Sequence, residues 1–374
     1  MDDTASIWRW ANSLQQRQQS LSDEEIKEHC NTCVVLLGDQ DRRIRFEAVR
    51  AHTAIANSRQ VEVARAYAGV LSRAVDGLVV CLEASTGEVR RTASRALGAI
   101  AGNSHAELGA AYALQLPYVL GSLTACLAGT DSLLRASAAK ALGDIAGSSH
   151  AEVGAAYAVE VPQMMGELVT CLRDQIGLVR GPAAYALGVI ACSPHTEVGT
   201  AWAAELLRVV DSLIALLDDS AAEVRASAVE ALRAIAASPH ASVSTVYVGE
   251  LPRVLAGVVV CLGDRHLMVR ASASKALGII ACSPAATLLA DSVGVLLCVM
   301  DALVASLRDV NAEVRRRAAA SLGAIAEISC ADATEAHAGA LLRTEEALRA
   351  CLDDEDARVQ TSAASALIAF DRTE

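Results

Sequence analysis

The sequence predicts an all-α protein, a solenoid of tandem repeats. Of the 374 residues, 53% are hydrophobic but only 3% are aromatic, so the apolar content is mostly Ala, Val and Leu. Ala and Leu favour helices, whereas sheets depend on aromatic and β-branched residues. An apolar residue followed by arginine also recurs every 45 residues, and a single fixed step indicates stacked repeats. These arginines are Arg45, Arg90, Arg135, Arg180, Arg225, Arg270 and Arg315, and the eighth station holds Gln360.

Columns of alanine, leucine and isoleucine keep the same step and define the units. One such unit cannot cover its own apolar face, so neighbouring units must stack into a single solenoid domain over 13–372. Residues 1–12, which contain Trp8 and Trp10, are predicted to form an N-terminal capping helix. The eight predicted repeats are 13–57, 58–102, 103–147, 148–192, 193–237, 238–282, 283–327 and 328–372.

Each unit reads as three helices, as the repeat 148–192 illustrates. Ser149 and Glu152 fit a capping box, which predicts a short first helix through about residue 159. Pro162 lies where a second helix would begin, because proline at the first helical position loses no hydrogen bond. The apolar spacing that follows predicts a third helix over about 178–191.

Two of these patterns resemble known repeat families. The run from Ala141 to Ala146, a short capped helix and then Val161-Pro162 resemble the three-helix armadillo unit, although 45 residues exceeds the usual armadillo length. An aspartate six residues before the apolar-Arg pair resembles HEAT repeats, and two units depart, with Ala84 and Gly129 at the acidic station. The pairs are Asp39/Arg45, Asp174/Arg180, Asp219/Arg225, Asp264/Arg270 and Asp309/Arg315.

The resemblance implies a right-handed α-solenoid, an armadillo/HEAT-like superhelix whose third helices line a concave groove. It also implies that the Asp–Arg pairs form a structural ladder between neighbouring units. Removing one member of a partly buried pair would leave the other charge uncompensated. The alternative, in which the arginine column binds a partner directly, stays open.

The candidate partner-binding residues lie on the third helices and face away from the predicted core. Their neighbours are mostly Gly, Ala and Ser, as at Gly98 and Gly143, and small residues would let a ligand backbone approach closely. The Trp and Asn ladders of armadillo proteins that carry nuclear-import signals are missing from these positions. The candidates are Arg50, Arg91, Arg95, Lys140, Tyr185 and Lys275. The first four predict that the N-terminal half of the groove prefers an acidic segment, and a merely solvated face is the alternative.

The net charge of −12 disfavours nucleic acid and anionic membranes, because both require Lys and Arg to replace counterions. The uncharged stretch 108–130 could span a bilayer by length, but it contains Gly and Pro and its counterparts 45 residues later carry charge. We therefore expect buried helices and no membrane insertion. The N-terminus lacks a signal-peptide pattern, so we expect a cytoplasmic protein with reduced cysteines.

Candidate metal ligands and catalytic residues are few. A column of histidines recurs at the first-helix starts, but stacked units lie roughly 10 Å apart, too far for side chains to share one zinc ion readily. Cys30 and Cys33 form a lone C-x-x-C, and Cys33 occupies a column that elsewhere holds leucine. The chain has no phosphate loop and no nucleophile elbow. We expect no cofactor and no metal. The histidines are His105, His150, His195 and His240.

Another column places aromatic side chains on the predicted first helices. Packing between repeats is the favoured interpretation, and an aromatic ridge for a partner is the alternative. The column consists of Tyr67, Tyr112, Tyr157, Trp202 and Tyr247.

The sequence therefore predicts a non-enzymatic protein–protein interaction scaffold with an elongated concave groove, acting within a larger assembly. One alternative is a structural component of a cytoskeletal or ciliary/axonemal complex, bound through its convex face and edges. Another is a metal-dependent HEAT-like enzyme similar to deoxyhypusine hydroxylase. That enzyme holds iron with His-Glu dipeptides, and the sequence contains none.

Overall fold

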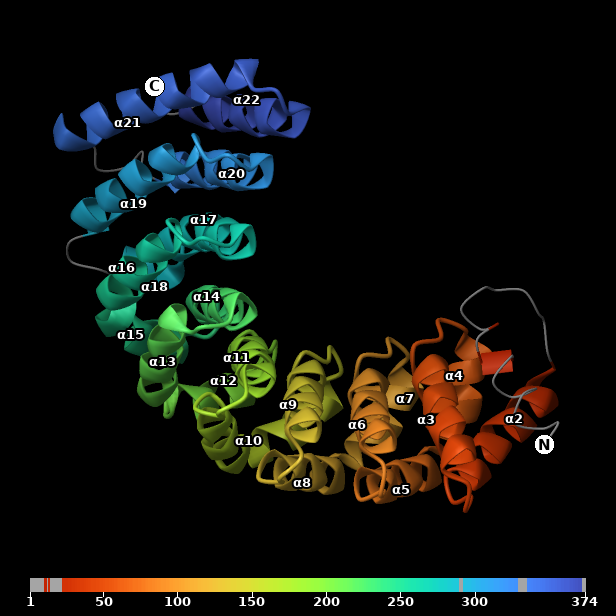
Figure 1. Ribbon diagram of the computed structural model, residues 1–374. Helices are drawn as coiled ribbons and strands as arrows, with labels where there is room; N and C mark the ends of the chain where they lie inside the picture. The colour runs from red at the N-terminus through yellow and green to blue at the C-terminus, as the bar shows by residue number, and fades with distance from the viewer. Residues whose placement is uncertain (1–9, 12, 14–21, 289–291, 329–334, 372–374) are drawn as a thin grey trace. The chain divides into compact units, whose positions relative to one another are not determined.

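The computed structural model describes residues 10, 11, 13, 22–288, 292–328 and 335–371, and every regular element in these ranges is a helix (Figure 1). Most of the predicted capping helix at 1–12 lies outside the described residues. Trp10 is buried, and its ring lies 4.7 Å from that of His29, measured between ring centroids.

The chain divides into two compact units, Met1–Glu205 and Leu206–Glu374. The helices of the first unit are α2 (Asp23–Leu36), α3 (Arg42–Ala56), α4 (Val61–Ala68), α5 (Leu71–Leu82), α6 (Gly87–Ala101), α7 (Ala106–Ala113), α8 (Leu116–Leu127), α9 (Ser132–Ala146), α10 (Ala151–Cys171), α11 (Gly177–Ala191) and α12 (Thr196–Ala203). Those of the second are α13 (Leu206–Ala215), η1 (Leu216–Asp218), α14 (Ala222–Ala236), α15 (Ala241–Tyr247), η2 (Val248–Glu250), α16 (Leu251–Cys261), α17 (Leu267–Ala281), α18 (Pro284–Thr287), α19 (Ser292–Ser306), α20 (Ala312–Ile328), α21 (Glu335–Ala350), η4 (Cys351–Asp353) and α22 (Ala357–Asp371).

The third helices keep the 45-residue step. Helices α3, α6, α9, α11, α14, α17, α20 and α22 begin at residues 42, 87, 132, 177, 222, 267, 312 and 357. Within each unit, consecutive third helices pack against one another, α3 to α11 in the first and α14 to α22 in the second (Figure 1). The protein is an all-α solenoid, as the sequence predicts. The repeat boundaries and the single domain over 13–372 stay predictions.

The repeat 148–192 differs from its prediction. Helix α10 runs unbroken through Pro162, so the predicted break there is wrong. A proline inside a helix removes one backbone hydrogen bond. The apolar faces on both sides of it are buried, with Tyr157 before it and Met165 after it, and their packing keeps the helix continuous.

The predicted capping box at Ser149 and Glu152 is also wrong. Helix α10 begins at Ala151, its N-cap is His150, and no side chain caps it. The hydroxyl oxygen of Ser148 instead accepts the backbone N–H of His150 at 3.4 Å. The turn before the helix therefore uses the first serine of the Ser-Ser pair.

The apolar stretch at 108–130 packs against neighbouring helices of the protein. It forms α7 and α8, which meet at an angle of 68°. Leu108, Leu116, Leu120 and Leu123 are fully buried against neighbouring helices. By length and composition alone, 241–261 could also cross a bilayer, and 39% of its most apolar window is buried inside the protein.

The aromatic column ties repeats together. The hydroxyl of Tyr112 donates to the backbone oxygen of Leu97 at 2.7 Å, and that of Tyr157 donates to the oxygen of Leu142 at 3.0 Å. Each tyrosine is at most 1% exposed and reaches from a first helix to the preceding third helix. The column packs between repeats, and the alternative of an exposed aromatic ridge is wrong.

The glycines of the third helices also serve packing. A Cβ added at Gly143 would lie 2.8 Å from the Cα of Ala186 in the next third helix, and at Gly323 it would lie 2.9 Å from the Cα of Ala366. The space that the missing side chains leave is taken by the neighbouring helix. The close approach of neighbouring third helices depends on these glycines, and room for a ligand backbone beside them stays a prediction.

Candidate functional site

The arginine column makes two kinds of contact. Arg225 donates from Nη1 to the backbone oxygen of Asp219, six residues earlier, at 2.7 Å. Its Nε and Nη2 reach the carboxylate of Asp264, 39 residues later and in the next repeat, at 2.6 and 2.8 Å. The ion pair therefore links neighbouring repeats, whereas the Asp–Arg pair seen in the sequence is joined only through the backbone.

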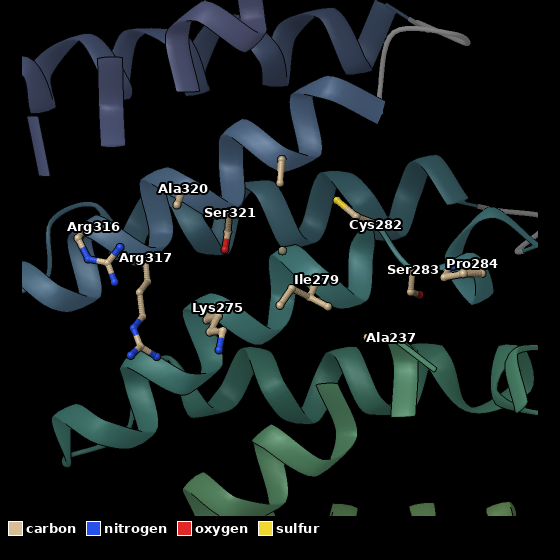
Figure 2. A pocket seen from close by; sticks show the side chains of 12 residues that line it. Ala237, Lys275, Ile279, Cys282, Ser283, Pro284, Arg316, Arg317, Ala320 and Ser321 are labelled. Atoms are coloured by element: carbon tan, nitrogen blue, oxygen red, sulfur yellow. The ribbon is translucent and has the colours of Figure 1, made fainter. Parts of the chain in front are cut away.

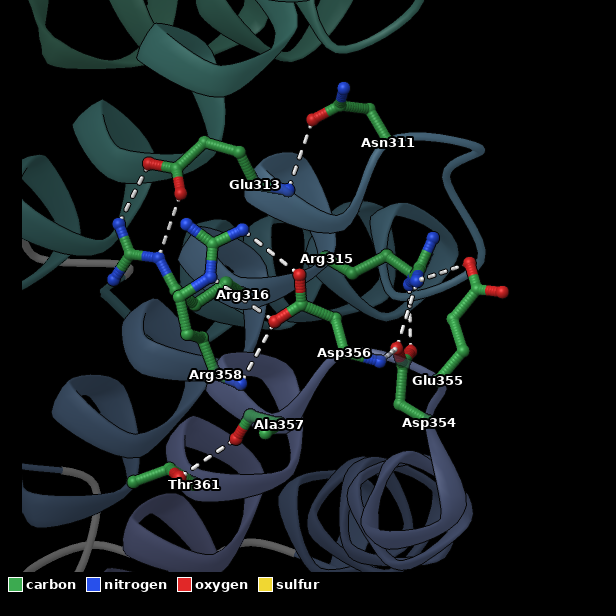
Figure 3. Close-up of polar contacts among 10 residues, drawn as sticks. All are labelled: Asn311, Glu313, Arg315, Arg316, Asp354, Glu355, Asp356, Ala357, Arg358 and Thr361. Carbon is green, nitrogen blue, oxygen red and sulfur yellow. Dashed lines mark hydrogen bonds and ion pairs between the residues drawn. The ribbon is translucent and has the colours of Figure 1, made fainter.

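Other arginines repeat this pattern. Arg315 pairs with Asp354 at 2.7 Å and with the exposed Glu355 at 3.3 Å (Figure 3). The hydrogen bond from Arg315 lowers the pKa of Asp354 below its usual value. Further pairs of this kind are Arg135 with Asp174 at 2.7 Å and Arg270 with Asp309 at 2.6 Å.

Two arginines, Arg45 and Arg90, lie 39 residues before positions where the sequence has Ala84 and Gly129 in place of an aspartate. Arg90 finds Asp131 where its station holds Gly129, and the hydrogen bond from Arg90 lowers the pKa of Asp131. Arg45 donates to the backbone oxygens of Asp39 and Gln40 at 2.6 and 2.9 Å. The same kind of backbone contact occurs at Arg180, whose Nη1 donates to the backbone oxygen of Asp174 at 2.7 Å.

A hollow of about 430 Å³ opens between the third helices of the first unit. Three predicted candidates line it: Arg95 on α6, Lys140 on α9 and Tyr185 on α11. Arg50 and Arg91 lie outside it, and Arg50 forms an ion pair with Glu47 at 3.3 Å. The full lining is Thr53, Asn57, Arg95, Gly98, Ala99, Gly102, Lys140, Gly143, Asp144, Gly147, Tyr185 and Val189.

The charges in this first hollow are unequal. Lys140 Nζ lies 2.8 Å from an oxygen of Asp144 and 5.2 Å from the ring centroid of Tyr185. The Tyr185 hydroxyl donates to Asp144 at 3.1 Å, and partial burial together with this carboxylate raises the pKa of Tyr185 to about 12. Asp144 therefore balances Lys140. Arg95 is exposed and has no hydrogen bond or ion pair with any described residue, so it is the available cation.

A second hollow, of about 590 Å³, opens between α17 and α20 in the second unit (Figure 2). The predicted candidate Lys275 lines it together with Arg316 and Arg317, which the sequence analysis missed. Its remaining lining is Ala237, Gly278, Ile279, Cys282, Ser283, Pro284, Ala320, Ser321 and Ala324. The sequence could have predicted Arg316, because it occupies the same repeat column as the candidate Arg91.

One carboxylate holds both arginines of the second hollow. Arg316 donates to Glu313 from Nε and Nη2 at 2.9 and 2.7 Å, and Arg317 donates from Nε at 2.7 Å. The hydrogen bonds from these arginines lower the pKa of Glu313 to about 2, so it stays ionised at neutral pH. Arg317 Nη1 also donates to the backbone oxygen of Ala271 at 3.3 Å.

The candidate metal ligands are engaged in packing. A ring nitrogen of His150 lies 2.6 Å from the backbone oxygen of Asn103, and one of His195 lies 3.1 Å from that of Ser148. Cys30 is fully buried, and burial raises its pKa to about 12. Across the described ranges, no group of three or more His, Cys, Asp or Glu residues could hold a metal ion.

Comparison with known proteins identifies the repeat type. The family model of GCN1-like C-terminal HEAT repeats matches residues 240–373, and the HEAT repeat model matches 209–238. A search of curated proteins found no match.

Solved structures of helical repeat proteins share the fold. A crystal structure of an engineered protein is 25% identical, with 98% of this chain and 95% of that chain covered and a TM-score of 0.50. A designed armadillo repeat protein in complex with the peptide (KR)4 is 22% identical, with 67% and 98% covered and a TM-score of 0.51. The regular helical step, the inter-repeat ladder and these matches agree: the chain is a helical repeat protein of the armadillo/HEAT type.

Proposed function

We propose that this protein is a non-enzymatic scaffold that binds other proteins through its third helices. The observation that carries the proposal is the first hollow, which spans four successive third helices and presents Arg95, a cation that pairs with no described residue. The ladder arginines, buried tyrosines and histidines are engaged in packing between repeats. Arg95, Lys140 and Tyr185 are instead exposed in the first hollow, and the residue at their column changes from repeat to repeat.

The partner that fits the first hollow is an acidic extended segment. The designed armadillo protein described above binds a basic peptide, (KR)4. In this chain the uncompensated charge of the hollow is positive, because Asp144 neutralises Lys140 but no described residue forms an ion pair with Arg95. Complementary charge sets the specificity of such contacts and their rate of association. We therefore infer a partner of opposite charge to that peptide, taken up in the cytoplasm within a larger assembly.

The chain offers a sharp test, because it has only three lysines. Lys140 lines the first hollow, Lys275 lines the second, and Lys27 lies on α2 outside both. A carbodiimide couples a lysine amine directly to a carboxylate. Apart from an internal link to Asp144, which lies 2.8 Å from its amine, we expect Lys140 in native extract to couple to partner carboxylates, as identified by mass spectrometry, and Lys27 to form no link to a partner.

The variant Arg95→Glu reverses the available charge and should abolish these cross-links. Arg265→Glu, which changes an exposed arginine outside both hollows, is the matched control and should keep them. If both variants cross-link like the wild type, or if Lys27 couples as often as Lys140, the acidic-segment proposal is wrong.

A second candidate is a structural component of a cytoskeletal or ciliary/axonemal complex, bound through the outer face and edges. Exposed valines on the second helices favour it, because Val35, Val80 and Val260 share one repeat column and are 70%, 67% and 71% exposed. Imaging of the tagged protein separates the candidates, since a diffuse soluble pool contradicts this one.

Elemental analysis tests the disfavoured metal-dependent enzyme, which requires stoichiometric metal.

A further inference from the structure

The second hollow has two chemically different ends. The side chains of Lys275, Arg316 and Arg317 gather at one end, and Ile279 lies toward the middle (Figure 2). Beyond them the lining is small or apolar, with Ala237, Cys282 and Pro284. A ligand that fits both ends must carry a negative group beside an apolar one.

The net charge at the cationic end is positive by two. Three cations, Lys275, Arg316 and Arg317, stand against the single carboxylate of Glu313, and three minus one leaves two. The nearby Arg358 is paired with Asp356 at 2.9 Å and adds no net charge. An uncompensated charge of two is unusual in a chain whose total is −12.

Glu313 orients the arginines but does not use all their donors. It engages Nε and Nη2 of Arg316 and Nε of Arg317, while Ala271 accepts from Nη1 of Arg317. No described residue accepts from Arg316 Nη1, Arg317 Nη2 or Lys275 Nζ. Three donor groups therefore remain for a ligand. Glu313 holds the two that belong to arginines in place beforehand, which reduces the entropy lost on binding.

The donor set matches a phosphoryl group better than a carboxylate. A phosphorylated side chain carries about −1.5 to −2 charges at pH 7 and three acceptor oxygens, whereas a carboxylate carries one charge and two oxygens. We propose that the second hollow binds a phosphorylated serine or threonine of a partner protein. The apolar end around Ile279 then accepts a neighbouring apolar side chain of the same segment. This inference rests on the proposed scaffold function but concerns a different site.

Binding is tested with synthetic peptides and the full-length protein. Peptide arrays with a central phosphoserine, and with each flanking position fixed in turn, identify a preferred sequence. That peptide is then titrated as its phosphoserine, glutamate and serine forms by fluorescence anisotropy. We expect the phosphoserine form to bind roughly ten-fold more tightly than the glutamate form, about the effect of one hydrogen bond to a charged group. Equal affinity of the two forms overturns the proposal.

Variants locate the site. Lys275→Gln and Arg317→Gln should each weaken phosphopeptide binding roughly ten-fold. Arg265→Gln, which removes an exposed charge of the second unit outside the hollow, and Arg95→Gln in the first hollow should leave it unchanged. Lys275 is exposed and makes no hydrogen bond or ion pair with a described residue, so its variant should melt like the wild type. Loss of binding in Arg95→Gln, or none in Lys275→Gln, contradicts the assignment.

Two further arms separate the sources of phosphate. Inorganic phosphate at millimolar concentration should displace the peptide only weakly, because it lacks the apolar neighbour. Vesicles with phosphatidylinositol phosphates should not bind in a Lys275-dependent manner. If they do so more tightly than the peptide, the site recognises lipid and the proposal is wrong. If phosphopeptide binding is not observed, the carbodiimide test of the first hollow is unaffected. If the carbodiimide test fails while the phosphopeptide binds, only the proposal for the first hollow is contradicted.

Discussion

Single residues in this protein often combine burial with one well-placed polar contact. His52 has no exposed surface, and its Nδ1 lies 2.8 Å from the hydroxyl of Tyr67. Burial lowers the pKa of His52 to about 4. Tyr112 and Tyr157 likewise bury a hydroxyl against a backbone oxygen of the preceding third helix. Such contacts make particular side chains sensitive to pH or to the loss of one atom.

The buried histidine predicts a pH dependence of stability. His52 is neutral in the folded protein above about pH 4, whereas an unfolded histidine gains a proton below about pH 6.5. Its contribution is fully present above pH 6.5 and is lost as the pH falls towards 4, by about 2 kcal/mol at pH 5. Urea unfolding at pH 7.5 and 5.0 measures it. His52→Gln cannot titrate and should lose less stability over this interval, and an unchanged difference contradicts the assignment.

The tyrosine contacts predict a modest, position-specific effect. Tyr112→Phe removes the hydroxyl that donates to Leu97 and should lower the free energy of unfolding by about 1 kcal/mol. Tyr118→Phe, on the next helix, changes a side chain that is 50% exposed and should have almost no effect. Equal melting temperatures for the two variants would show that the buried hydrogen bond adds no net stability.

At the scale of the helices, packing in this protein depends on how closely neighbouring third helices approach one another. At Gly143 the neighbouring helix leaves no room for a Cβ, and at Gly278 an added Cβ would lie 2.5 Å from the Cβ of Ser321. Ile368 occupies the same repeat column in α22 and is 53% exposed. The column therefore marks where one third helix crosses the next.

Two glycines predict changes of opposite sign. Gly143→Ala should lower the free energy of unfolding by about 1–3 kcal/mol, because the added methyl group forces α9 away from α11. Gly166→Ala, inside α10 with nothing within 4 Å of the new Cβ, should raise it by up to about 1 kcal/mol through helix propensity. Urea unfolding of both variants measures the difference. Two stabilised variants would mean that the helix contact is loose.

At the scale of the whole molecule, neighbouring repeats within each compact unit are held together by the same kinds of contact. The arginine ladder provides the polar part of that set. Arg225 is 8% exposed and Asp264 is 11% exposed, so this pair is largely shielded from water. Gln360 occupies the ladder position in the last repeat and is uncharged. Its Nε2 still donates to the backbone oxygen of Asp354, at 2.6 Å.

That glutamine suggests a clean test of the ladder. Arg225→Gln should retain the backbone bond to Asp219 but leave the Asp264 carboxylate unpaired, which should cost about 2–3 kcal/mol of unfolding free energy. Arg343→Gln breaks a pair with Asp301 in which both side chains are more than half exposed, and it should cost less than about 1 kcal/mol. Chemical denaturation compares them, and equal losses would contradict a special role for the ladder.

The site was predictable only in part. The repeat columns placed Arg95, Lys140 and Tyr185 on third helices, and the structure brings all three to one hollow. The pairing of Lys140 with Asp144 was not predicted, because repeat columns relate residues 45 apart and not residues one helical turn apart. Arg316 and Arg317 were missed because the run beginning at Arg315 was assigned to the ladder alone.

Residue order alone predicts the helical class, the 45-residue step and a third helix near 178–191, because the apolar residues that become buried recur at fixed intervals. Which polar groups meet across repeats follows from the packing of the folded chain. The carboxylate that pairs with Arg225 lies 39 residues later in the chain, and the room at Gly143 is filled by a helix one repeat further on. Such contacts depend on the distance between neighbouring helices, which no single repeat encodes.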